Sequence, residues 1–233
     1  MSKNLPISPS AFQKKLKGDS DGFVLNIDSG GTLRWATYLG GTGAEELLGI
    51  CNDHRDNVYV TGFSTSVDYK TTALAHQDTL RGKQDVIVTC FDTLGTLRWS
   101  TYFGGNENDI GTAIVADDHR NVYVTGSTGS KRLEIRGDDT AQVNFAGGPE
   151  DAFVISFERN GILDFATYYG GGNSDKAVAI DWYHKAVAIA GQTNSSNLYI
   201  GPRSIQYNKK AGYDGFTLNL DTNGKFLRAT YLG

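Results

Sequence analysis

Carboxylates recur at fixed positions along this chain and are the residues best placed to do chemistry. Glu45, Asp109 and Asp175 each follow a Gly-Gly link, once in each of three repeats. Equivalent positions in successive repeats meet at one end of a repeat array, so we expect an acidic arc that suits a cation or a basic partner. The alternative that stays open is a solvated rim that only aids solubility. The candidate binding face consists of Glu45, Glu46, Asn106, Glu107, Asn108, Asp109, Asn173, Ser174 and Asp175, with Tyr69 and Tyr199 from the variable links.

A second set of aspartates precedes a hydrophobic strand pattern in every repeat. These residues are Asp21, Asp85, Asp151 and Asp214. An aspartate at a strand entry commonly accepts hydrogen bonds from nearby backbone N–H groups, which predicts a structural role. Calcium would need several more converging oxygens. We therefore expect no metal or cofactor, with calcium as the alternative.

The remaining reactive side chains do not form a catalytic pattern. His54, His119 and His184 fall in turns on separate hairpins, where they cannot share the tight coordination sphere of a zinc ion. The chain has no G-x-S-x-G, HExxH or P-loop motif. Most Trp and Tyr residues recur inside strand patterns, which favours core packing over a ligand surface. The sequence predicts a protein that is not an enzyme.

One repeated segment must position all of these residues. DGFVLNIDSGGTLRWATYLGG begins at Asp21, and related segments begin at Asp85, Asp151 and Asp214. Each full repeat has four strand signals joined by two tight turns and one long variable link. A repeat of this length with four short strands is typical of a β-propeller blade. In an up-and-down blade, the long links and Gly-Gly links share one face and the tight hairpins share the other.

The order of strands within a blade follows from side-chain size. The first strand carries the smallest residues and should lie innermost, while the fourth carries Trp35, Trp99 and Phe165 and should lie outermost, with its aromatics wedged between blades. This order predicts an all-β propeller domain of four-stranded antiparallel blades. Residues 42–105, 106–171 and 172–233 are whole blades, and 1–41 is an outer half blade, so the domain is incomplete alone and its strand edge invites association.

The motif resembles the bacterial β-propeller repeat known as SBBP. The pattern is D-x-F-V, then G-x-L-x-W-[AS]-T-Y-[LF]-G-G, then NVYVTG, then a link ending in A-x-Q-x-x-L-x-G, as in Ala75–Gly82 and again in Ala11–Gly18. The third full repeat departs from it, with Phe165 for Trp and AVAIAG for NVYVTG. The resemblance implies a scaffolding or recognition domain of secreted or surface proteins, and it brings no catalytic residues.

Composition narrows the partners and leaves the compartment open. The net charge is −4 and no basic stripe occurs, which argues against nucleic acid. No stretch approaches the ~20 apolar residues that span a bilayer. The N-terminus has no apolar signal region. Resemblance therefore favours an extracellular or surface location, and a native start at Met1 would favour the cytoplasm.

These observations predict a non-catalytic scaffold or protein-interaction module. Its expected partner is a protein or a second copy, which would supply the missing half blade unless further blades do so. The alternative function is a glycan-binding, lectin-like propeller with aromatic residues in pockets of the variable links.

Overall fold

The computed structural model describes residues 5–210 and 212–233, and within them it contains strands and no helix. Accordingly, none of these residues belongs to a helix that could cross a membrane. A half sheet consists of β1 (Gly22–Ile27) and β2 (Leu33–Leu39). Sheet 1 comprises β3 (Glu45–Asn52), β4 (Val58–Ser64), β5 (Asp85–Phe91) and β6 (Leu97–Phe103); sheet 2 comprises β7 (Asp109–Ala116), β8 (Val122–Thr128), β9 (Asp151–Phe157) and β10 (Leu163–Tyr169); sheet 3 comprises β11 (Asp175–Tyr183), β12 (Ala186–Thr193), β13 (Asp214–Asp221) and β14 (Phe226–Leu232).

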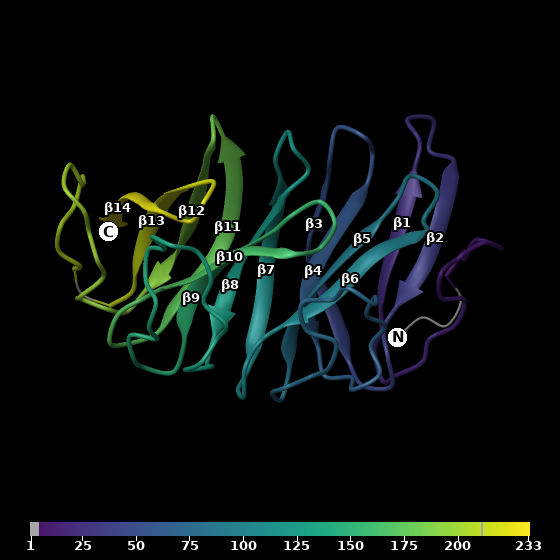
Figure 1. The fold of residues 1–233 in the computed structure, drawn as a ribbon, viewed down its shortest axis with the longest axis horizontal. Helices are drawn as coiled ribbons and strands as arrows, with labels where there is room; N and C mark the ends of the chain where they lie inside the picture. Colours follow the sequence, from purple (N-terminus) through teal and green to yellow (C-terminus); the bar gives the residue numbers. More distant parts are fainter. Residues whose placement is uncertain (1–4, 211) are drawn as a thin grey trace.

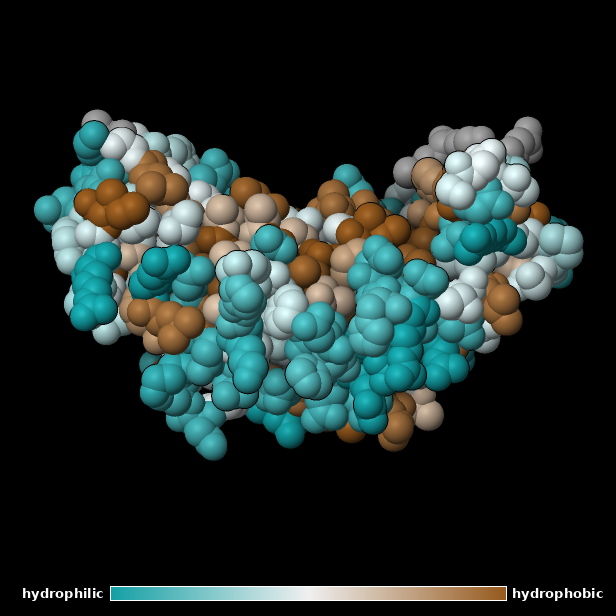
Figure 2. Space-filling view, turned by 90° about the horizontal axis from the view of Figure 1, so that it is seen from above, coloured by the Kyte–Doolittle hydropathy of each residue, from teal (hydrophilic) through white to brown (hydrophobic). Residues whose placement is uncertain are grey.

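Each four-stranded sheet is an antiparallel meander, as in a propeller-like blade. The sheets follow one another in chain order, from the half sheet near the N-terminus to sheet 3 at the C-terminus (Figure 1). Seen along the strands, the molecule is a crescent with apolar side chains along its hollow (Figure 2). The first strands β3, β7 and β11 contact one another from sheet to sheet, which fits their predicted innermost position.

Small residues allow these inner strands to approach closely. A Cβ atom added to Gly49 in β3 would lie 3.0 Å from the Cα of Ala113 in β7. One added to Gly111 would lie 2.3 Å from Oγ1 of Thr61, which belongs to the preceding sheet. The third strands β5 and β9 are buried along their whole length because sheets cover both of their faces.

Outer-strand aromatics lock each sheet onto the next. The contacts are Trp35 on Gly95, Trp99 on Gly161 and Phe165 on Gly224, each glycine lying in the hairpin between the third and fourth strands of the following sheet. Gly161 has φ 86, and a Cβ there would meet Trp99 at 2.8 Å. The Trp99 indole also donates a hydrogen bond from Nε1 to the Arg159 carbonyl at 3.1 Å. The predicted aromatic wedge is thus a ring seated on a glycine turn.

The two ends of the crescent differ in polarity. In the half sheet, β1 pairs with β2 and with no other described strand, and it exposes Phe23, Leu25 and Ile27. At the other end, sheet 3 presents Thr217, Asn219 and Arg228 at positions where sheet 1 buries Val88, Cys90 and Trp99. The half sheet therefore ends in an apolar face, and sheet 3 ends in a polar one.

Alanine substitution of the hairpin glycines should separate backbone strain from aromatic packing. Gly31→Ala is the matched control, because Gly31 has φ 82 in the equivalent turn of the half sheet, with nothing within 4 Å of an added Cβ. We expect Gly31→Ala to cost about 1 kcal/mol of unfolding free energy, from the left-handed backbone alone. Gly161→Ala should cost roughly 3 kcal/mol, because the methyl group also displaces Trp99. Urea unfolding measures both, and equal losses would contradict the interlock.

Candidate functional site

The three carboxylates that follow the Gly-Gly links are buried. Glu45, Asp109 and Asp175 are 2%, 1% and 0% exposed and stand at the first positions of β3, β7 and β11. The structure corrects the expected exposed arc, because the links fold over these side chains and bond to them. Contact between the three carboxylates and a partner would require the links to open.

Asp109 shows how such a carboxylate is accommodated. It accepts hydrogen bonds from the Gly105 amide at 2.7 Å, from Ser130 Oγ at 2.9 Å and from the Thr128 hydroxyl. The same arrangement holds Asp175, with Gly171 and Ser195 as donors at 2.7 and 2.8 Å. Burial raises the pKa of Asp109 to about 6, and the three donors oppose that rise.

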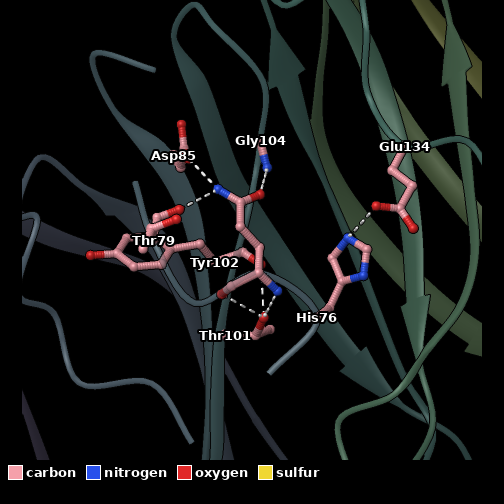
Figure 3. A network of polar contacts seen from close by, with 8 residues as sticks. His76, Thr79, Asp85, Thr101, Tyr102, Gly104 and Glu134 are labelled. Carbon is pink, nitrogen blue, oxygen red and sulfur yellow. Dashed lines mark hydrogen bonds and ion pairs between the residues drawn. The ribbon is translucent and has the colours of Figure 1, made fainter. Parts of the chain in front are cut away.

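The strand-entry aspartates lie beside these acids. Asp85 accepts hydrogen bonds from the amides of Arg81 and Gly82, at 2.8 and 3.1 Å, and from the Gln77 side chain at 2.6 Å. Gln77 in turn accepts from the Gly104 amide at 3.0 Å, which ties the long link to the Gly-Gly link (Figure 3). Asp85 thus has the structural role predicted for an aspartate at a strand entry, which is to accept hydrogen bonds from nearby backbone N–H groups.

Gly104 separates the two carboxylates of the pair. A Cβ atom at this position would lie 2.7 Å from both Asp85 and Asp109, so only glycine fits. The charge of Asp85 adds to the rise in the Asp109 pKa. The pattern D…GG…[DE] therefore describes a packed carboxylate pair with a glycine between its members.

Asp151 is the exception among the strand-entry aspartates. It is fully buried and accepts one hydrogen bond, from the Ala146 amide at 2.6 Å, while its Oδ1 has no partner among the described residues. Gln142, which corresponds to Gln77, donates to the Asn144 carbonyl as Gln77 does to the Thr79 carbonyl, but it has no hydrogen bond to Asp151. Burial raises the pKa of Asp151 to about 7, and the charge of Asp175 adds to the rise. Asp151 can therefore hold a proton near neutral pH.

Six other residues of the candidate face are accessible to solvent. Exposed or half-buried positions in the Gly-Gly links are Glu46, Asn106, Glu107, Asn108, Asn173 and Ser174. Glu107 pairs with Lys83 at 3.1 Å in solvent. Binding by these six residues stays a prediction.

The two tyrosines of the variable links have different surroundings. Tyr69 is 3% exposed; it packs against Tyr102 and bonds Thr89 Oγ1 at 2.7 Å, so the structure corrects its expected surface position. Tyr199 is 60% exposed, with its ring edge-on to Phe226. Of the two, only Tyr199 can meet a ligand directly.

In the part of the chain described, no three His, Cys, Asp or Glu side chains are grouped so as to hold a metal ion.

The hydroxyl donors of the buried acids were not predicted from the sequence. They occur as pairs two residues apart, and the first of each pair is the last residue of the second strand: Ser64 with Ser66, Thr128 with Ser130, and Thr193 with Ser195. This [ST]-x-S pattern recurs in register with the acids. A carboxylate and two hydroxyls that recur together indicate a buried network.

Stability should fall as the pH rises from about 4 to 7. Folded Asp151, with its pKa near 7, keeps a proton that the unfolded chain releases at the ordinary aspartate pKa of 3.8, so deprotonation favours unfolding across this window. Asp151→Asn carries no charge and should reduce the fall in melting temperature between pH 5 and 8 by at least about 3 °C. Thermal scans of the wild type and of Asp151→Asn at both pH values test this. An unchanged slope in Asp151→Asn would contradict it.

Comparisons with known proteins support the resemblance within one repeat. Residues 98–134, which run from β6 through β7 and β8 into the long link of sheet 2, match the family model described as SBBP, beta-propeller repeat. No curated protein matches the chain significantly. The matched segment contains Asp109 with its hydrogen-bond donors and the Trp99 side chain of the aromatic wedge. Residues 98–134 are an SBBP-type beta-propeller repeat, set in an all-β chain of propeller-like sheets.

Proposed function

We propose that the chain is a non-catalytic interaction module of the propeller type, with three whole blades and the outer half of a fourth. The half sheet is the interacting part, and a pair of strands from a second copy or from further blades completes it. The observation that carries this proposal is the lone edge of β1, which borders an exposed apolar face. Such an edge pairs readily with an added strand.

The exposed face of β1 matches a buried face elsewhere in the chain. Phe23 and Ile27 are 53% and 52% exposed, whereas the equivalent Ile87 and Phe91 of β5 are both 0% exposed. In sheet 1 the corresponding edge of β5 is paired with β4, from Val58↔Phe91 to Ser64↔Asp85. A strand with the chemistry of NVYVTG therefore suits the vacant edge of β1.

A cavity lies where such a strand would pack. It measures about 400 Å³ and is lined by Leu5, Leu16, Gly22, Phe23 and Leu47, among others. Gly22 and Leu47 correspond to Val86 and Gly111, and at that junction the side chains of Thr61 and Val86 both adjoin Gly111. The cavity thus takes the place of a second-strand residue, which supports strand addition at this edge.

The polar end of sheet 3 argues against copies that stack end to end. Such stacking would bring Phe23 and Ile27 against Arg228 and Asn219, whose side chains bond each other at 3.0 Å. Burying an arginine without a carboxylate partner is unfavourable. Completion is therefore proposed through the edge of β1 and not through sheet 3.

Light scattering over a range of concentrations tests self-completion. We expect a dimer or larger assembly that the double variant Phe23→Ser/Ile27→Ser converts to monomer. Both side chains are exposed, so the monomer should keep its stability. Leu227→Ser, at a residue 48% exposed in sheet 3, is the matched control and should not change the mass.

A peptide of residues 109–128 tests completion by further blades, because it carries an inner strand pair of this same repeat. We expect it to raise the melting temperature of the chain and not that of the double variant. A chain that is monomeric at every concentration and unaffected by the peptide would refute the proposed function.

A further inference from the structure

A groove on the tight-hairpin side lies between sheets 1 and 2, apart from the carboxylate pairs and the half sheet. Its volume is about 450 Å³, and it is lined by Arg98, Arg120, Arg159, Asn57, Asn160 and Trp99, among others. We call it the arginine groove. A cleft of this size holds a small ligand.

The arginines of the groove come from three separate segments. Arg98 belongs to β6, Arg120 to the turn between β7 and β8, and Arg159 to the turn between β9 and β10. No acidic residue lines the groove, and none of the three guanidinium groups has an ion pair or hydrogen bond within the described part of the chain. Three like charges in one cleft repel each other unless an anion neutralises them.

The acids near the groove form no ion pair with its arginines in the described part of the chain. Burial raises the pKa of the Cys90 thiol in the groove wall to about 12; the charges of Asp53 and Asp92 add to that rise and the charge of Arg98 opposes it, so charges of both signs act on the groove wall. The adjacent acid is Asp53, which is 4% exposed and bonded to Asn57 and Tyr59. These neutral donors favour its ionised form, so Asp53 offsets part of the positive charge from beneath the groove.

The same place in the repeat carries other charges at the other junctions. Beside the half sheet, Arg34 matches Arg98, but Asp56 takes the position of Arg120, and Asp28 joins them in the cavity wall. Between sheets 2 and 3, Asp164 replaces Arg98 in a cavity that also contains Asp138, Asp139 and Asp221 beside Arg136 and Lys225. The fold therefore does not require arginines here, and the positive excess stands out in a chain of net charge −4.

We propose that the arginine groove binds an oxyanion, a carboxylate, sulfate or phosphate group carried by a small ligand. Arginine offers a planar fork of donors that matches all three groups. Asn57, Asn160 and Trp99 can contact the remainder of the ligand, the amides by hydrogen bonds and the indole by its apolar surface. This site does not depend on the proposed role of the half sheet.

The position of Arg120 provides a clean variant for the test. Arg120 has φ 68, a left-handed conformation that asparagine adopts more readily than arginine. Arg120→Asn should therefore remove a charge without loss of stability. Arg98→Gln removes a second charge at an exposed site, and Arg34→Gln is the matched control at the equivalent position beside the half sheet.

Isothermal titration of the full chain with sulfate, phosphate, glucuronate and glucose tests the proposal. We expect saturable anion binding that weakens with added NaCl, with no binding of glucose. Arg120→Asn and Arg98→Gln should each weaken it at least about tenfold, since each removes charge-assisted hydrogen bonds. Arg34→Gln should bind as the wild type does.

The anions also distinguish the sources of the oxyanion. Tighter binding of glucuronate would identify an acidic sugar, and binding of sulfate or phosphate alone would identify an inorganic or esterified anion. Either result supports the site. The proposal fails if none of the three anions binds, if glucose binds equally well, or if the two groove variants bind like the wild type.

Discussion

The close approach of neighbouring sheets is the constraint on which this structure depends. At each junction there are places where no Cβ atom fits, including Gly104 between two carboxylates and Gly161 beneath an indole ring. A glycine has no side chain that could take part in binding or catalysis. Its recurrence at such positions therefore indicates close packing. The Gly-Gly link is therefore part of the interface between sheets, although it resembles a flexible loop in the sequence.

Burial of acids follows from the same constraint. Once the link lies against the next sheet, the carboxylate of Asp109 is removed from water and needs donors, which the link amide and two hydroxyls supply. Asp151 shows the consequence when donors are missing: a neutral carboxyl near pH 7 takes the place of a bonded carboxylate. The pKa of Asp151 is raised to about 7 and that of Asp109 to about 6, so the carboxyl group with fewer donors titrates at the higher pH.

Much of the fold could be predicted from the sequence, because hairpin turns and strand alternation are local. The strand order within each sheet and the wedge formed by Trp99 follow from residue size at recurring positions. The candidate site was harder to predict. Recurrence shows that Glu45 and Asp175 occupy equivalent places, but it does not show whether a side chain points to solvent or under a link. The predicted surface position of Tyr69 was wrong for the same reason, since a variable link can still place one residue in the core.

The arginine groove could not be predicted from the repeats, because its combination of three arginines occurs at one junction only among the described residues. The positions of Arg98, Asp164 and Arg34 are equivalent, yet their charges differ, whereas the hairpin glycines beside them and the buried acids at the other end of the sheets recur. A packed junction fixes the backbone of the groove and leaves its lining free to vary without cost to the core. Ligand binding on such a scaffold should therefore be sought where equivalent positions disagree in charge, and structural bonds where they agree. By this reasoning, the uniform acids are part of the scaffold and the arginines are candidates for recognition.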